Sequence, residues 1–362
     1  MIQSKLKSVG EALRRLLTTH PATTVGVALG SEAIQFAEVR WIQGKPELIA
    51  AGIEKIPANS VKDGCILNEE TLVESLRRIW ALHGIKSKHV VVSLSGQNVF
   101  LRELLFPAMS DEELRQAIKW ELDKYIPSAD AENYYFDFVV LESAKNLQSC
   151  RVLLVAAPLA MINRMTRVLK EAGLKPIALD IEPLALQRTM KQANNAIVVD
   201  IDDECCKLTL FQQGFPLVAR FIPFSGAGHT EVLWQTLEPD LSKAEKRTTR
   251  YGDEPVAVSQ QDVKSLVAVL AREIRRTIDY YQMQNRDAFI DKIIVTGGRA
   301  QLGNLAANLA ELLPETEVVV HSPVMQLQLS PSLSKERMQE IELPIAVAIG
   351  LALRGSDENN GG

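Results

Sequence analysis

The sequence predicts an α/β protein built as two similar lobes, and three observations support this fold class. The chain has 362 residues, about twice the length of a usual domain, and is 46% hydrophobic, enough to fill a large core. Short apolar strands alternate with segments whose apolar residues recur at helical spacing. A hairpin of three strands opens the chain, and a similar group of strands returns near residue 196. We therefore expect a duplicated fold, with a first lobe over residues 23–195 and a second over residues 196–354.

The first lobe is predicted from its apolar runs and the turn residues between them. Its expected strands and helix, in chain order, are strands over 23–29, 33–41 and 47–53, a helix over 72–82 that Gly84 ends, and a strand over 90–94. Gly30 and Ser31 form the tight turn between the first two strands. Fully apolar strands of this kind are typical of a sheet that is covered on both faces.

A strand–helix–strand–strand block predicts a subdomain inserted into the first lobe at about residues 98–173. Its expected elements are a strand over 99–105 that Pro107 breaks, a helix from the capping box at Ser110 to Tyr125, strands over 134–140 and 152–157, and a helix over 159–172. A strand over 174–181 and a helix over 183–191 then lead to the second lobe.

The second lobe repeats the opening pattern. The expected elements are strands over 197–201, 207–211 and 217–222, a long helix over 261–284, a strand over 292–296, a Gly297-Gly298 turn and a helix over 302–312. Residues 223–287 are predicted to form an outer subdomain, and residues 355–362 a disordered tail.

Charge and composition exclude several kinds of site. The chain has 40 Lys and Arg against 45 Asp and Glu, a net charge of −5, whereas nucleic-acid binding needs a basic surface. The four cysteines show no CxxC spacing, and the five histidines form no HxH or HExxH pair. We therefore expect no nucleic-acid partner, no disulfide framework and no metal site.

The sequence contains no run that is long enough to span a bilayer. The longest apolar run, 343–353, is about half of the roughly 20 residues that a spanning helix needs, and the start of the chain lacks a secretory-signal core. We therefore expect a cytosolic protein. Residues 1–22 predict an amphipathic helix with leucines on one side and basic residues on the other. This helix either packs on its own domain or lies on an anionic membrane surface.

The two-lobed pattern points to the duplicated fold of actin, the chaperone ATPases and the sugar kinases, in which a nucleotide sits between the lobes. Within that fold class the chain resembles the PilM family, actin-like proteins of bacterial type IV pilus assembly, and more distantly FtsA. The stretches that carry the resemblance are 109–127, 155–158 with 172–174, Asp180-Ile181-Glu182-Pro183, 273–281 and 348–354. They occur in the family's order, and the resemblance as a whole covers almost the entire chain, roughly 25–354.

The resemblance implies a partner, because PilM-like proteins bind the cytosolic N-terminal tail of PilN, a membrane protein. The groove for such a tail is expected between the opening sheet and the insert, lined by Val99, Leu101, Leu104, Phe106, Leu114, Ile118 and Tyr125. Each of these residues alone is better explained as core between two subdomains, whereas the region as a whole suits a groove.

The resemblance also implies a nucleotide site, and here the sequence departs from the family pattern. Ala28 stands at the acidic position of the first turn, Asp202 at the glycine position of the second, and Thr248 at a family lysine. The residues that remain for a nucleotide are Gly30, Ser31, Gln35, Asp200, Glu245, Gly297, Gly298 and Arg299. We therefore expect ATP or ADP to bind weakly, and expect neither magnesium coordination nor hydrolysis.

These features favour a non-catalytic cytosolic scaffold of the pilus inner-membrane platform, peripheral to the inner membrane, that binds a PilN-like tail. The alternative is an active actin-like ATPase whose nucleotide state switches partner binding. A sugar or acetate kinase would share the fold, but the sequence shows neither a catalytic Asp in the cleft nor an acceptor pocket.

Overall fold

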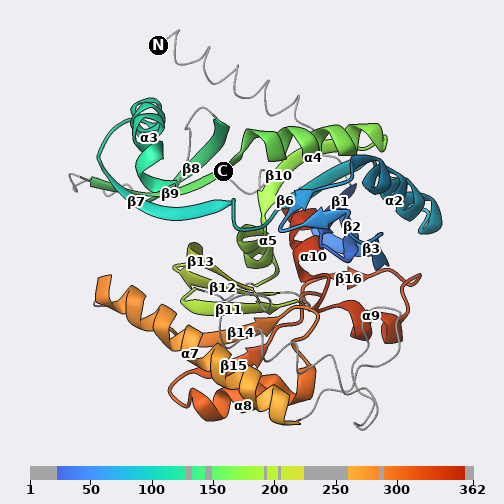
Figure 1. Cartoon of the computed structure of the whole chain (residues 1–362). Helices are drawn as coiled ribbons and strands as arrows, with labels where there is room; N and C mark the ends of the chain where they lie inside the picture. The colour runs from blue at the N-terminus through green and yellow to red at the C-terminus, as the bar shows by residue number, and fades with distance from the viewer. Residues whose placement is uncertain are drawn as a thin grey trace.

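The computed structural model describes residues 23–126, 133–142, 149–190, 194–202, 205–223, 260–284 and 289–354. Two large sheets form the centres of two lobes, and a smaller sheet lies beside them (Figure 1). The strand order is β10-β6-β1-β2-β3-β16 in the first large sheet and β13-β12-β11-β14-β15 in the second. Each large sheet begins with an antiparallel three-stranded meander, β1-β2-β3 or β11-β12-β13, so the predicted duplication is visible in the strand pairing.

The first sheet contains β1 (Thr23–Leu29), β2 (Ala33–Ile42), β3 (Lys45–Lys55), β6 (His89–Leu94), β10 (Lys175–Ile181) and β16 (Gln328–Leu329). Helices α2 (Glu69–Leu82) and α4 (Leu159–Glu171) bury their apolar faces in one core with β1, β2 and β6. Next to this sheet lies a short hairpin, β4 (Val61–Lys62) with β5 (Cys65–Ile66).

The insert consists of a three-stranded sheet, ordered β7-β9-β8, with one helix on its face. Its elements are β7 (Phe100–Pro107), α3 (Asp111–Tyr125), β8 (Tyr134–Glu142) and β9 (Ser149–Pro158). Ser110 caps α3, and the reciprocal bond from Glu113 completes the predicted capping box. Pro107 is the last residue of β7. The strand tolerates it because β7 is at the edge of the sheet, where a missing backbone N–H leaves no strand unpaired.

Helix α4 falls within the range predicted for the insert, 98–173, but its side chains do not pack with α3. Met165, Val168 and Leu169 are buried against α2 and the first sheet. The insert sheet and its helix thus occupy residues 100–158, and α4 belongs to the first lobe.

The second sheet contains β11 (Ala196–Ile201), β12 (Cys205–Gln212), β13 (Phe215–Pro223), β14 (Lys292–Thr296) and β15 (Glu317–Val320). Helices α7 (Gln260–Gln284) and α8 (Leu305–Leu312) cover it. The helix expected over 302–312 is broken near its start, because Gly303 and Asn304 have φ of +47° and +62°. Both residues belong to a short 3-10 turn, Leu302–Asn304, that directly precedes α8.

The end of the chain returns to the first lobe, which differs from the predicted second-lobe range of 196–354. Strand β16 pairs with β3, and α9 (Lys335–Ile341) and α10 (Ala346–Leu353) pack on β2 and β3. The apolar run that is too short to span a membrane is therefore a buried internal helix, with all eight residues of α10 covered.

Helix α10 lies very close to β1 and to α5 (Glu182–Thr189), and two glycines make this possible. A Cβ on Gly350 would lie 1.8 Å from the Ala185 carbonyl oxygen, and one on Gly26 would lie 1.9 Å from that of Ala348. The same helices pack side chains from both large sheets into one core. This contact therefore joins the two lobes.

A buried carboxylate fixes the ends of these helices. Asp180, at the end of β10, lies 2.8 Å from Arg188 of α5 and 3.0 Å from Arg354 just after α10. Arg354 also donates to the Leu179 carbonyl. Two of the stretches that carry the family resemblance, 180–183 and 348–354, thus meet in space and hold the lobe junction together.

Several predictions from the sequence lie outside the described residues. They are the N-terminal helix over 1–22, most of the outer subdomain (224–259 and 285–288) and the tail over 355–362. Within the described residues, no helix is both long and apolar enough to cross a membrane.

We predict that Gly350→Ala destabilises the protein, although alanine favours a helix over glycine by about 1 kcal/mol. The new methyl group would overlap the backbone of α5, and overpacking of this severity costs about 3 kcal/mol. Urea unfolding of the two proteins measures the difference. An unchanged or higher stability would show that α10 and α5 are not in such close contact.

We also predict that acid weakens the lobe junction through His321, whose ring lies 2.9 Å from the Thr189 hydroxyl at the end of α5. Burial lowers its pKa from 6.5 to about 4. Between pH 6.5 and pH 4, His321 is protonated in the unfolded chain but stays neutral in the folded chain. The free energy of unfolding therefore falls by about 3 kcal/mol over this range. His321→Gln lacks this loss, so the stability of the wild type relative to the variant should fall by about 3 kcal/mol over this pH range. A difference that stays constant would contradict the assignment.

Candidate functional site

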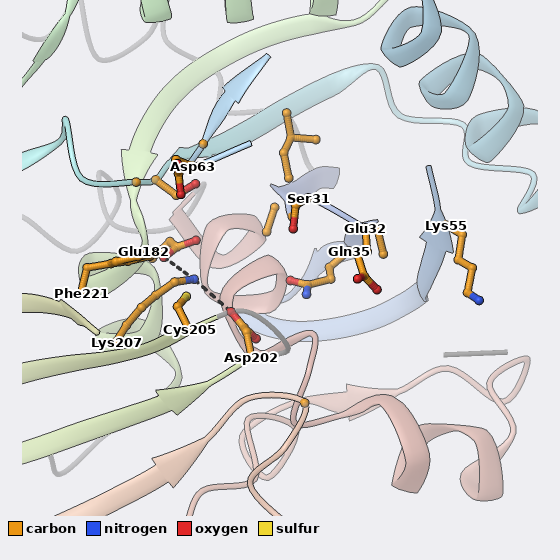
Figure 2. A pocket seen from close by; sticks show the side chains of 18 residues that line it. Ser31, Glu32, Gln35, Lys55, Asp63, Glu182, Asp202, Cys205, Lys207 and Phe221 are labelled. Carbon is orange, nitrogen blue, oxygen red and sulfur yellow. Dashed lines mark hydrogen bonds and ion pairs between the residues drawn. The ribbon is translucent and has the colours of Figure 1, made fainter. Parts of the chain in front are cut away.

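A cavity lies where the tight turns of the two lobes face each other (Figure 2). The first lobe contributes the turn between β1 and β2, with Ala28, Gly30, Ser31 and Gln35. Glu182, at the start of α5, also lines it from the first lobe, and the opposite wall comes from β12, β13 and the turns that follow β11 and β14. The sequence predicted both turns, and the fold brings them to one cleft.

The predicted nucleotide residues divide into three groups. Gly30, Ser31, Gln35 and Gly298 line the cavity. Asp200, Gly297 and Arg299 do not line this cavity, and Asp200 instead lines the larger cavity described below. A Cβ on Gly297 would fall 2.4 Å from the Asp200 carboxylate, and the Arg299 amide donates to the Ile201 carbonyl. Glu245 and the departure at Thr248 lie outside the described residues.

The centre of the site is Lys207, which the sequence analysis did not identify. Its ammonium nitrogen lies 2.9 Å from a Glu182 carboxylate oxygen, 3.0 Å from Asp202 and 4.0 Å from Asp200. Figure 2 shows the lysine extended between Glu182 and Asp202. Asp202 lines the cavity, as its position in the second turn predicted, and is paired with Lys207.

Local structure accounts for each member of this Lys207 cluster. Lys207 is opposite Asp200 in the antiparallel pairing of β12 with β11, so the two side chains share a face of the sheet. Asp202 is held by its amide, which donates to the Cys205 carbonyl in the turn between these strands. Glu182 is the first residue of α5, directly after β10, and so belongs to the other lobe.

The charge state of each member of this cluster depends on the others. Burial, together with the charge of Asp202, raises the pKa of Asp200 well above its usual value. Burial opposes the charged form of Lys207, but Glu182, Asp202 and Asp200 outweigh it and raise the pKa of the lysine. Removing one partner of a buried ion pair leaves an uncompensated charge, which costs about 3–5 kcal/mol.

The residues of this cavity do not fit a metal-bound triphosphate. Ala28 offers no oxygen ligand, and no group of three or more His, Cys, Asp or Glu in the described ranges is arranged to hold a metal ion. The cavity has a volume of about 110 Å³, whereas small-molecule sites usually have at least about 300 Å³. Carboxylates of Glu32, Asp63, Glu182 and Asp202 around it would repel phosphate.

A second, larger cavity of about 500 Å³ lies beyond the Lys207 cluster, between the insert and both lobes. Its apolar lining includes Val99, Phe100 and Leu101 from the start of the insert, and its cations include Arg102 and Arg220. Lys207, Glu182, Phe221, Ser95 and Gly96 line both cavities, so the cluster forms part of the wall between them.

The residues predicted for a partner groove do not lie together. Val99 and Leu101 line this larger cavity. Phe106, Leu114 and Ile118 are at most 5% exposed and form the core between α3 and the insert sheet, so they offer no surface to a partner. Leu104 belongs to the same core but also lines, with Leu101, a further cavity between β7, β13 and α7. Tyr125 is the last residue of α3.

Some of what the prediction missed left a signal in the sequence. Glu182 stands in one of the stretches that carry the resemblance, at the start of a helix that follows a strand. The hairpin predicted from 197–201 and 207–211 already places Lys207 near Asp200. The contact of Glu182 with Lys207 has no such signal, because it joins two lobes.

Comparison with known proteins agrees with this architecture. A family described as "Type IV pilus assembly protein PilM" matches residues 26–356. A solved structure described as a PilM–PilN type IV pilus biogenesis complex is 26% identical, with a TM-score of 0.77, over 93% of this chain and 99% of that one. The ethanolamine utilization protein EutJ of Carboxydothermus hydrogenoformans shares the fold, at 17% identity and a TM-score of 0.50, over 92% and 90% of the two chains. The two-lobed actin-like fold is thus confirmed, and the chain belongs to the PilM family of type IV pilus assembly proteins.

Proposed function

We propose that this protein is a partner-binding component of the type IV pilus inner-membrane platform that receives the cytosolic N-terminal tail of a PilN-like protein. It acts at the cytoplasmic face of the inner membrane, where such a tail is available. The similar solved structure is a PilM–PilN complex, and its likeness extends over nearly the whole of both chains.

The observation that carries this proposal is the larger cavity at the base of the insert. Its volume of about 500 Å³ is in the range of binding sites for small ligands and peptide side chains. Val99, Phe100 and Leu101 supply apolar walls, while the exposed Arg102 can pair with backbone carbonyls or acidic side chains. Arg220, on the same wall, is already paired with Glu273. An extended tail with leucine-like residues suits this lining.

We propose further that partner binding needs no ATP turnover. The carboxylates around the smaller cavity between the two turns, and the small volume of that cavity, support weak nucleotide binding without a magnesium ion. An ATPase whose nucleotide state controls the partner is the competing function, and it requires a site that binds phosphate tightly.

Filling the mouth of the larger cavity should block the tail. Gln97 is exposed and lines this cavity, so Gln97→Trp adds bulk there without disturbing the core. We expect the affinity for a synthetic peptide of the PilN-like tail to fall at least about tenfold, a loss of about 1.4 kcal/mol, in isothermal titration calorimetry.

The matched control is Asn98→Trp, since Asn98 is equally exposed in the same loop but does not line the cavity. It should bind the peptide as the wild type does. Equal losses in both variants would place the tail elsewhere, and no binding by the wild type at tens of micromolar would end the proposal.

The wild type should show no phosphate release from magnesium-ATP, and a fluorescent ATP analogue should bind weakly. Ala28→Asp with Asp202→Gly restores an acid to the first turn and removes one from the second, so binding should strengthen at least about tenfold. Micromolar, magnesium-dependent binding by the wild type, lost in Asp202→Ala alone, would instead favour the ATPase.

A further inference from the structure

The actin-like fold implies a metal-bound nucleotide between the lobes, and the residues of this chain do not fit one. The charged group at that place is the ammonium of Lys207. We propose that Lys207 is a built-in cation that bridges the two lobes and holds the cleft closed without nucleotide or metal. This goes beyond the proposed function and does not depend on it.

The bridge joins the second lobe to the start of α5, the helix that leads from the first sheet into the lobe junction. Lys207 is in the middle of the second sheet's hairpin and pairs across strands with Asp200. Glu182 continues directly from β10 of the first sheet into α5. The 2.9 Å contact between Lys207 and Glu182 therefore crosses the cleft, while the contact with Asp202 lies within the second lobe.

The surroundings make this contact stronger than an ordinary surface ion pair. The Lys207 and Glu182 side chains are 21% and 12% exposed, so solvent screens their attraction only in part. Asp202 and Asp200 add two further carboxylates within 4.0 Å, which keep the lysine charged. The raised pKa of Lys207 agrees with a permanent positive charge at neutral pH.

The position of the bridge also links it to the larger cavity. Lys207, Glu182 and Phe221 line both cavities, so a shift of the lysine changes the wall of each. A lobe movement that separates Glu182 from Lys207 would therefore widen both cavities at the same time.

The test measures the distance between the lobes directly. Spin labels at Glu74→Cys on α2 and Glu311→Cys on α8, both exposed positions, report it by double electron–electron resonance. Cys65→Ser removes the half-buried native thiol, and the remaining three are buried. Without nucleotide or metal, the wild type should give one narrow distribution, whereas Lys207→Ala should give a broader one with a longer mean distance.

Chemical rescue distinguishes the missing charge from a general loss of packing. Millimolar n-propylammonium should restore the narrow distribution in Lys207→Ala, because it supplies the ammonium and most of the stem. Glu182→Gln, which preserves the shape of the side chain, should open the cleft as Lys207→Ala does, and it tests the bridge from the other lobe if the lysine variant does not fold. Lys55→Ala removes a lysine that lines the same cavity from the first lobe and should leave the distribution unchanged.

Three results would overturn the inference. They are a wild-type distribution in both Lys207→Ala and Glu182→Gln, an opening that propylammonium does not reverse, and an equal opening in Lys55→Ala.

Discussion

The architecture depends on the close approach of α10 to α5 and β1. Gly26 and Gly350 leave no room for a side chain between these backbones, and the core that results contains residues from both large sheets. Asp180 with its two arginines fixes the ends of the same helices. Because this junction is at the base of the cleft, it sets how far apart the two turns are and hence how much space remains between them.

The distance between the two turns decides how strong the contact between Glu182 and Lys207 is. In a wider cleft, Glu182 and Lys207 would each be solvated, and their attraction would be small. At 2.9 Å and largely buried, they form a contact that is costly to break from either side. In our proposal, this contact also occupies the place where an actin-like fold holds phosphate, and it therefore weakens nucleotide binding.

Local sequence signals predicted most of the elements because their causes are local. The capping box at Ser110 fixes the start of α3. Gly173, with φ of +81°, terminates α4 two residues after its last helical residue. Strand β15 has only four residues, and its apolar run of three valines, 318–320, is short for a strand. The break before α8 arises from two consecutive left-handed residues, which a helical pattern does not show.

The site was less predictable, because it depends on contacts between distant parts of the chain. Phe106 and Ile118 show the same apolar character as Leu101, and only the packing of α3 on the insert sheet separates core from cavity wall. Asp202 could be recognised as a departure from the family pattern, but its partner could not. Asp202 is explained by Lys207, which the fold places 3.0 Å from its carboxylate.

The central claim is that the partner site is complete without nucleotide. The most direct measurement is the dissociation constant of the PilN-like tail peptide, determined by calorimetry on the full chain, first in EDTA without nucleotide and then with saturating magnesium-ATP. Our account predicts the same constant in both conditions, because Lys207 already holds the lobes together. Binding that appears only with magnesium-ATP would contradict it.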